Sequence, residues 1–197
     1  MAVRERTETR LLDAADELLF THGVAATPVD AILARASVSP ATLYRAYGSK
    51  DGLVAAALDR RHRAWIEVWD AAVARAPDDR GRLLAVLDAL DAFRARPDGA
   101  RWCAFLGTAA EHADPVPAVA AALGRETDAL RARLTELAVP VAGERAALLA
   151  EELMLVVTGE LGMRLRGGSP PGVARAVAAV LVDRPPTPAD PSLISDG

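Results

Sequence analysis

The stretch that decides the fold runs from Ser39 to Leu53 and reads SPATLYRAYGSKDGL. It holds both tyrosines of the chain and its single lysine. Ser39 and Pro40 favour a helix start, because a hydroxyl can cap the first turn and proline is tolerated at the first helical position. Gly48 interrupts that helix, and Ser49 can cap another one. The stretch therefore predicts a short helix, a tight turn and a new helix.

Helical periodicity continues on both sides of this stretch. Apolar residues from Leu11 to Leu19 lie on one stripe, and Gly23 ends that first helix. Thr27 and Pro28 open a short second helix, roughly 28–35, in the same way as Ser39 and Pro40 open the third, roughly 40–46. The helix from Lys50 runs to about residue 75. Two short helices joined by a tight turn after a longer helix predict a helix-turn-helix.

Beyond Pro77 the chain continues in amphipathic and apolar helical patterns, and no strand pattern competes with them. We therefore expect an all-α protein of about nine helices. Residues 1–48 are predicted to form a three-helix helix-turn-helix domain. Residues 49–183 are predicted to form a larger helical bundle, and the Pro-rich segment 184–197 a disordered tail.

Composition narrows the classes of function. Hydrophobic residues make up 51% of the chain and charged residues 25%, which is typical of a globular protein. Cys103 is the single cysteine, and with three histidines it provides no metal set and no nucleophile–base set, so we expect no cofactor, no metal and no catalytic residue. The N-terminus lacks an apolar signal region, and no apolar run approaches about twenty residues. A cytoplasmic protein without a membrane partner is expected.

The third helix has side chains suited to the DNA major groove, which the second helix of such a motif enters by its N-terminal end. Pro40 and Ala41 are small and apolar, so they allow a close approach to base edges. Thr42 can bond a base edge or a phosphate, and Arg45 can fork onto guanine or phosphate. From Ala31 to Lys50 the chain has no acidic residue and three basic ones, which favours contact with a polyanion.

The tyrosines and the lysine are suited to the DNA backbone. Tyr44 and Tyr47 offer hydroxyl donors for phosphate oxygens, and Lys50 stands at a helix N-terminus that already attracts anions. A structural interpretation stands beside this one. Tyr44 can be a half-buried residue with its hydroxyl at the surface, Tyr47 can be a packing residue, and Lys50 can be a solvated charge.

Residues 8–58 resemble the N-terminal DNA-binding region of the TetR/AcrR family of transcriptional regulators. The shared features are the pattern LxxAxxLxxxxG in the first helix, the threonine that opens the second, the run VSPATLYRAYGSKDGL and the long helix after it. The resemblance implies DNA contacts at Thr27, Ser39, Pro40, Ala41, Thr42, Tyr44, Arg45 and Lys50. The chain departs from the family pattern at Ser37, where glycine is usual, and at Ala46-Tyr47, which removes one possible phosphate contact.

The resemblance also implies that the C-terminal bundle binds a small effector and forms a homodimer. Four aromatic residues are candidates for the effector pocket, although the alternative is that they are core: Trp65, Trp69, Trp102 and Phe105. The last two helices carry more apolar residues than one face of a small bundle needs, and a two-fold interface would bury the surplus. Candidates for this interface are Val156, Leu161, Val173 and Val177.

The leading hypothesis is therefore a dimeric DNA-binding regulator controlled by an effector. It acts as a repressor that an apolar small molecule releases from a near-palindromic operator in double-stranded DNA. One alternative is a helix-turn-helix protein that acts through protein contacts without binding DNA. Another is an all-α enzyme, which the scarcity of histidine and cysteine disfavours.

Overall fold

The computed structural model describes residues 2–96 and 103–185, and within these ranges it contains nine α-helices, one short 3-10 helix and no strand. The elements are α1 (Ala2–His22), α2 (Val29–Ala36), α3 (Pro40–Tyr47), α4 (Lys50–Arg75), α5 (Asp79–Arg94), α6 (Ala104–Glu111), α7 (Pro117–Ala142), η1 (Gly143–Arg145), α8 (Ala146–Leu165) and α9 (Val173–Val182). The predicted all-α fold is therefore confirmed. Residues 186–197, most of the predicted tail, lie outside the described residues.

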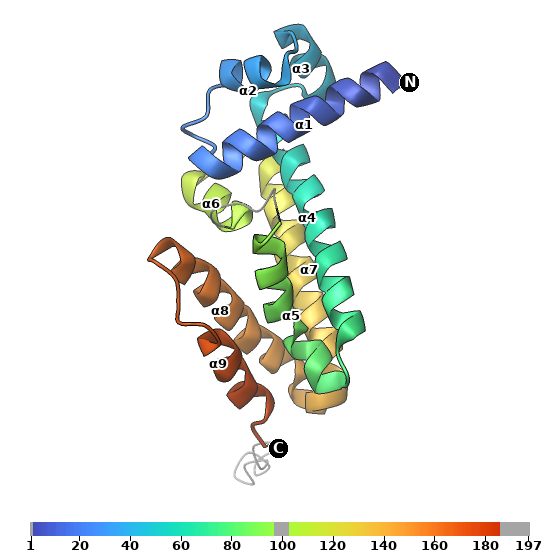
Figure 1. The fold of residues 1–197 in the computed structure, drawn as a ribbon, viewed down its shortest axis with the longest axis vertical. Coiled ribbons are helices and arrows are strands. Elements are labelled where there is room, and N and C mark those ends of the chain that lie inside the picture. Colours follow the sequence, from blue (N-terminus) through green and yellow to red (C-terminus); the bar gives the residue numbers. More distant parts are fainter. Residues whose placement is uncertain (1, 97–102, 186–197) are drawn as a thin grey trace, which may run out of the picture.

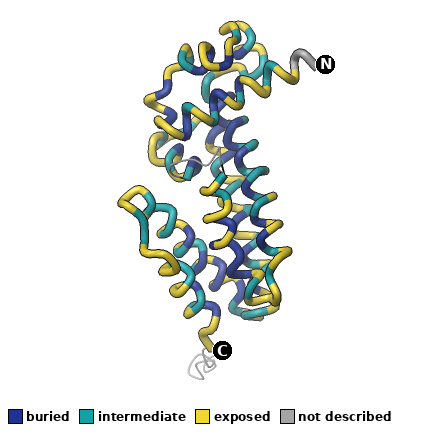
Figure 2. Tube along the Cα trace, viewed as in Figure 1, coloured by how far each residue is buried: buried dark blue, intermediate teal, exposed yellow. Residues whose placement is uncertain are grey.

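The helices form an elongated molecule with α1, α2 and α3 gathered at one end (Figure 1). α4 runs from that end along the molecule and packs against both α5 and α7. α8 packs against α7, and α9 packs against α8 and α5. Buried residues follow the inward faces of these helices along the molecule (Figure 2). No helix within the described residues combines the length and hydropathy that a membrane span needs.

Two clusters of buried side chains form the core, and α4 contributes to both. The N-terminal cluster joins α1, α2 and α3 to Leu53 and Leu58 of α4, and it also includes Phe105 of α6. The C-terminal cluster joins Trp65 and Trp69 of α4 to residues of α5, α7, α8 and α9. α4 is buried in both clusters, so the two predicted domains share one continuous helix. The domain division between residues 48 and 49 therefore stays a prediction.

The turn between α2 and α3 is left-handed at Ser37, where φ is 54° and ψ is 51°. The amide of Ser37 donates to the Ala34 carbonyl at 3.2 Å, and the amide of Val38 donates to the Leu33 carbonyl at 3.1 Å. This is the Schellman arrangement, which satisfies the last carbonyls of a helix and needs a residue with positive φ. Ser37 is the one non-glycine residue with positive φ among those described, and it stands where the resembled family usually has glycine.

The helix starts follow the predicted pattern at α4 but differ at α2. The Ser49 hydroxyl accepts the amide of Gly52 at 3.0 Å, so Ser49 caps α4 as predicted. At α2 the N-cap is Pro28 and no side chain caps the first turn, so the predicted cap by Thr27 is wrong. The Thr27 hydroxyl donates instead to the Gly23 carbonyl at 2.7 Å, because the side chain faces back toward the end of α1.

The strain at Ser37 gives a first testable prediction. We expect Ser37→Gly to raise the free energy of unfolding by about 0.5–1 kcal/mol, because glycine removes the clash of Cβ in the left-handed region. Ala34→Gly on the exposed face of α2 is the control, and it should lower stability by about 0.5–1 kcal/mol. Urea unfolding measures both, and a similar loss of stability in the two variants would mean that Ser37 is unstrained.

Candidate functional site

The N-terminal half of α3 is exposed and is anchored by a single buried residue. Leu43 has no exposed surface and fixes the helix on the N-terminal cluster. Pro40 and Ala41 are exposed on the other side. The hydroxyls of Ser39 and Thr42 share a hydrogen bond of 2.9 Å, and neither bonds the backbone of the helix end. The first turn of α3 therefore presents small side chains and two hydroxyls to solvent.

The next turn of α3 carries the two side chains with the longest reach on this surface. Tyr44 is 52% exposed and does not belong to the N-terminal cluster, which favours a solvent-facing role over a core role. Arg45 is exposed, and its guanidinium pairs with no carboxylate in the described ranges. Tyr47 is half-buried against the N-terminal cluster, and its hydroxyl donates to the Glu8 carbonyl at 3.5 Å. Burial raises the pKa of Tyr47, and the packing interpretation holds for this residue.

Two of the predicted DNA contacts point toward the protein itself. Thr27 is 3% exposed and both acceptors of its hydroxyl are main-chain carbonyls at the end of α1 and in the loop that follows. The Thr27 hydroxyl therefore holds the loop, and a DNA contact of this residue stays a prediction. The Lys50 ammonium donates to the Val24 carbonyl of the same loop. Its phosphate contact stays a prediction, with one of its three hydrogens already engaged.

The loop after α1 is also held by α6. The amide of Ala25 donates to the Glu111 carboxylate at 2.5 Å. Gly23 has φ of 100°, and a Cβ at this position would lie 2.7 Å from Glu111 Oε1. The positive φ favours glycine there, and a larger residue would also displace the Glu111 carboxylate. The same short segment thus receives contacts from Thr27, Lys50 and Glu111.

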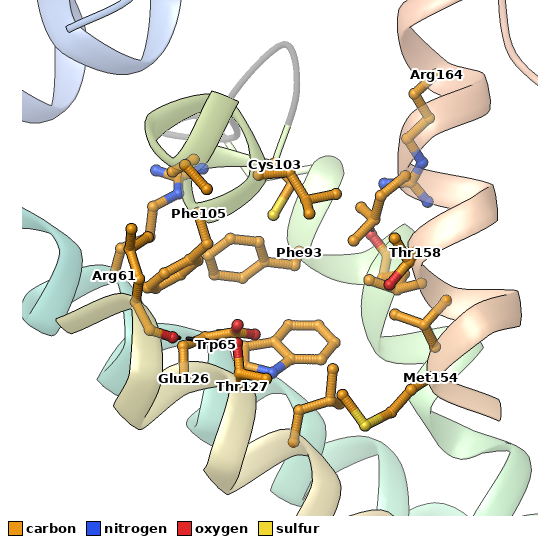
Figure 3. A pocket seen from close by; sticks show the side chains of 18 of the residues that line it. Arg61, Trp65, Phe93, Cys103, Phe105, Glu126, Thr127, Met154, Thr158 and Arg164 are labelled. Carbon is orange, nitrogen blue, oxygen red and sulfur yellow. Dashed lines mark hydrogen bonds between the residues drawn. The ribbon is translucent and has the colours of Figure 1, made fainter. Parts of the chain in front are cut away.

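A second candidate site is a cavity in the bundle, bounded by α4, α5, α6, α7 and α8 (Figure 3). Its volume is about 210 Å³, roughly that of seven liquid water molecules. Trp65 and Phe105 line it, as predicted. The apolar wall is completed by Leu90, Phe93, Leu123, Leu130, Met154, Val157 and Leu161. An apolar molecule of modest size fits such a chamber.

Two of the residues predicted for this pocket, Trp69 and Trp102, are not among the described residues of the cavity wall. Trp69 is fully buried and does not line the cavity, because it lies behind Trp65 with ring centroids 5.6 Å apart and beneath the Arg133 guanidinium at 4.7 Å. Trp102 lies outside the described residues. Leu161, predicted at the dimer interface, lines the cavity, and its interface role stays a prediction.

Charged side chains in the cavity wall were missed by the sequence-based prediction. Arg61, Glu126 and Arg164 line the cavity from α4, α7 and α8. Each lies on the apolar stripe of its helix. A charged residue within an apolar stripe was therefore the feature of the sequence that could have indicated these cavity residues. The Arg164 guanidinium bonds Asp91 at 3.2 Å and Glu160 at 3.4 Å. Burial raises the pKa of Glu126 to about 7.

Arg61 connects the cavity to the N-terminal helices. The residue is 7% exposed, and its guanidinium carbon lies 5.2 Å from the ring centroid of Phe20 on α1 and 5.1 Å from that of Phe93 on α5. Phe20 belongs to the N-terminal cluster and Phe93 lines the cavity. Such cation–π contacts are strongest when water is excluded. The Arg61 side chain therefore packs against one ring of the N-terminal cluster and one ring of the cavity wall.

The outer faces of α8 and α9 carry exposed apolar side chains. Leu155 is 74% exposed and Val180 is 69% exposed, and the predicted interface residues Val173 and Val177 are exposed on the same helix as Val180. Val156 is half-buried against the C-terminal cluster, and its neighbour Leu155 has the more exposed position on α8, so the interface role of Val156 stays a prediction.

Comparison with known proteins assigns the N-terminal region to a described family. Residues 11–57 match the model of the bacterial regulatory proteins of the tetR family. This segment spans the end of α1 through the first turns of α4, and it contains every residue for which a DNA contact was predicted. None of the curated proteins is significantly similar to the chain.

Solved structures resemble the chain over nearly its whole length. SCO4454, a TetR-family transcriptional regulator from Streptomyces coelicolor, is 26% identical with a TM-score of 0.74, and the match covers 90% of this chain and 91% of that one. A TetR transcriptional regulator from Streptomyces avermitilis is 28% identical with a TM-score of 0.77, covering 90% and 96%. One from Chloroflexus aurantiacus shares the fold at 21% identity, with a TM-score of 0.76 and coverage of 92% and 95%.

Proposed function

We propose that the chain is a regulator of the TetR family, because residues 11–57 match that family's model and the fold resembles TetR-family regulators. We further propose that it is a homodimeric repressor released from its operator by a small apolar molecule. The observation that carries the proposal is the exposed face of α3. Tyr44 and Arg45 stand free on a helix whose opposite side is anchored by Leu43. A helix held from behind with unpaired polar groups in front is suited to the major groove.

The roles of the α3 residues follow from their surroundings. Pro40 and Ala41 leave room for the helix end to approach base edges, and Arg45 has the fork geometry that recognises guanine or phosphate. Ser39 and Thr42 share a hydrogen bond of 2.9 Å in the free protein. Both hydroxyls can accept a further bond from DNA, and the one that accepts in this pair can also donate one.

DNA binding is tested by titrating the protein with duplex DNA from upstream of its own gene. We expect specific binding to a near-palindromic site. If a dimer makes about six phosphate contacts, log affinity should fall with log salt at a slope near −5. Arg45→Ala should lower affinity by about 1–3 kcal/mol, because an exposed cation at the groove is lost.

The matched control is Arg75→Ala, which removes an equally exposed arginine at the far end of α4. It should leave affinity and salt slope unchanged. Equal effects of the two substitutions, or a salt slope near zero, would contradict the assignment of α3 to DNA.

The exposed apolar faces of α8 and α9 support a dimer. Leu155 and Val180 would each leave water in an interface between two copies, and such burial contributes about 25 cal/mol per Å². Gly159 and Gly162, on the same helix as Leu155, have open space where a Cβ would stand, which allows a second helix to approach closely. A two-fold axis would bring these faces together as one self-complementary patch.

We expect Leu155→Glu combined with Val180→Glu to give a folded monomer with weak operator affinity, because two charges would be buried without partners on each side. Size-exclusion chromatography at micromolar concentration measures the oligomeric state of the double variant. Val139→Glu changes an exposed valine on α7 and is the control, which should stay dimeric. A dimer in the double variant would place the interface elsewhere.

Ligand control is supported by the contacts between cavity and N-terminal helices. Phe105 of α6 lines the cavity and is buried in the N-terminal cluster, and Glu111 of the same helix holds the loop after α1. Arg61 packs between Phe20 and Phe93 on a second route. A ligand that displaces Phe93 or Phe105 would favour one arrangement of these contacts over another. It releases DNA if that arrangement spaces the two α3 helices wrongly for the groove.

A further inference from the structure

Resting on the proposed function, and specifying its ligand, we propose that the cavity selects a protonated amine with an apolar body, whose ammonium group pairs with the Glu126 carboxylate.

The first support is the isolation of Glu126. The residue projects from α7 into the cavity beside Trp65 (Figure 3). Its carboxylate accepts no hydrogen bond and forms no ion pair with any described residue, although the side chain is largely buried. A buried carboxylate without a partner costs free energy, so such groups are normally paired. A ligand is the partner that can enter this position.

The second support is that the buried cations of the wall already have neighbours. Arg164 is bonded to Asp91 and Glu160, and its side chain is 7% exposed. Arg61 is stacked between two rings. Arg94, the third cation, is exposed to solvent. The unmatched charge inside the cavity is therefore negative, which favours a positively charged ligand over an anion.

The third support is the arrangement of rings around this carboxylate. The ring centroids of Trp65 and Phe93 lie 5.8 Å apart, their planes meet at 86°, and both residues line the cavity. Aromatic faces attract ammonium groups, and the effect grows when water is excluded. An ammonium near Glu126 would thus have a carboxylate and π-faces around it while its hydrocarbon part fills the apolar remainder.

The proposal also predicts how binding depends on pH. Burial raises the pKa of Glu126 to about 7, so between pH 6 and pH 8 the free protein passes from mostly protonated to mostly ionised Glu126. The other titratable or charged residues in the cavity wall are Arg61, Arg94, Cys103 and Arg164. The arginines stay charged, and burial raises the pKa of Cys103, so its thiol stays neutral. Affinity for an amine should therefore rise up to about tenfold over this range.

The test uses three probes with one hydrocarbon body: 4-phenylbutylamine, 4-phenylbutan-1-ol and 4-phenylbutanoate. Their affinities for the full chain are measured by calorimetry and by quenching of tryptophan fluorescence. We expect the amine to bind the native protein at least tenfold more tightly than the alcohol, since hydrogen bonds to charged groups are the stronger ones. The butanoate should bind most weakly.

Glu126→Gln should reduce the preference for amine over alcohol to within about twofold and abolish the pH dependence. Glu136→Gln, on the exposed side of the same helix, is the control and should behave as the native protein. Equal affinities for amine and alcohol, tighter binding of the butanoate, or an amine preference that survives Glu126→Gln would overturn the proposal.

The same proteins are then titrated with the upstream duplex in the presence of each probe. Amine binding that depends on Glu126 in a protein that binds no DNA would overturn the repressor function and leave the amine site intact. Specific DNA binding that the alcohol weakens as much as the amine does would keep the repressor and overturn the amine site.

Discussion

Continuity of α4 is the constraint on which the rest of the structure depends. The helix begins beside the turn that follows α3 and extends without interruption into the bundle, and it is buried at both ends in different clusters. A helix is stiff along its axis because every interior peptide is hydrogen-bonded within it. A displacement of the bundle at Trp65 is therefore transmitted to Leu53, which packs directly behind the helix-turn-helix. Arg61 lies between these positions and adds a lateral contact on each side.

Local rules were enough to predict most of the fold from the sequence. The bounds of α4 were predicted from Lys50 to about residue 75 and are Lys50–Arg75, because Ser49 and the residues before Pro77 mark both ends. Ser37 was recognised because the family that residues 8–58 resemble usually has glycine at this turn, and glycine is the residue that adopts positive φ without strain. The same local rules predicted that Thr27 caps α2, and this prediction was wrong. Its hydroxyl has a tertiary partner in the loop after α1, and capping statistics contain no information about such partners.

The cavity was only partly predictable, for a related reason. Helical periodicity indicates which side of a helix is buried but does not say whether the buried side meets protein or space. Trp65 and Trp69 lie on the same stripe, yet one lines the cavity and the other is sealed behind it. Glu126 and Arg61 interrupt otherwise apolar stripes, and that anomaly was visible in the sequence. Interpreting this anomaly required the structure. Arg61 packs between two aromatic rings, whereas Glu126 has no positively charged partner among the described residues.

The loop after α1 has an unusual property for a surface connection. Three successive residues, Gly23, Val24 and Ala25, each have a main-chain group bound by a side chain from a different place: Thr27 at the start of α2, Lys50 at the start of α4 and Glu111 at the end of α6. An exposed loop amide normally exchanges its hydrogen with solvent quickly. The Ala25 amide is instead protected for as long as α6 stays docked. The hydrogen-exchange rate of the Ala25 amide therefore reports directly how often the bundle separates from the helix-turn-helix.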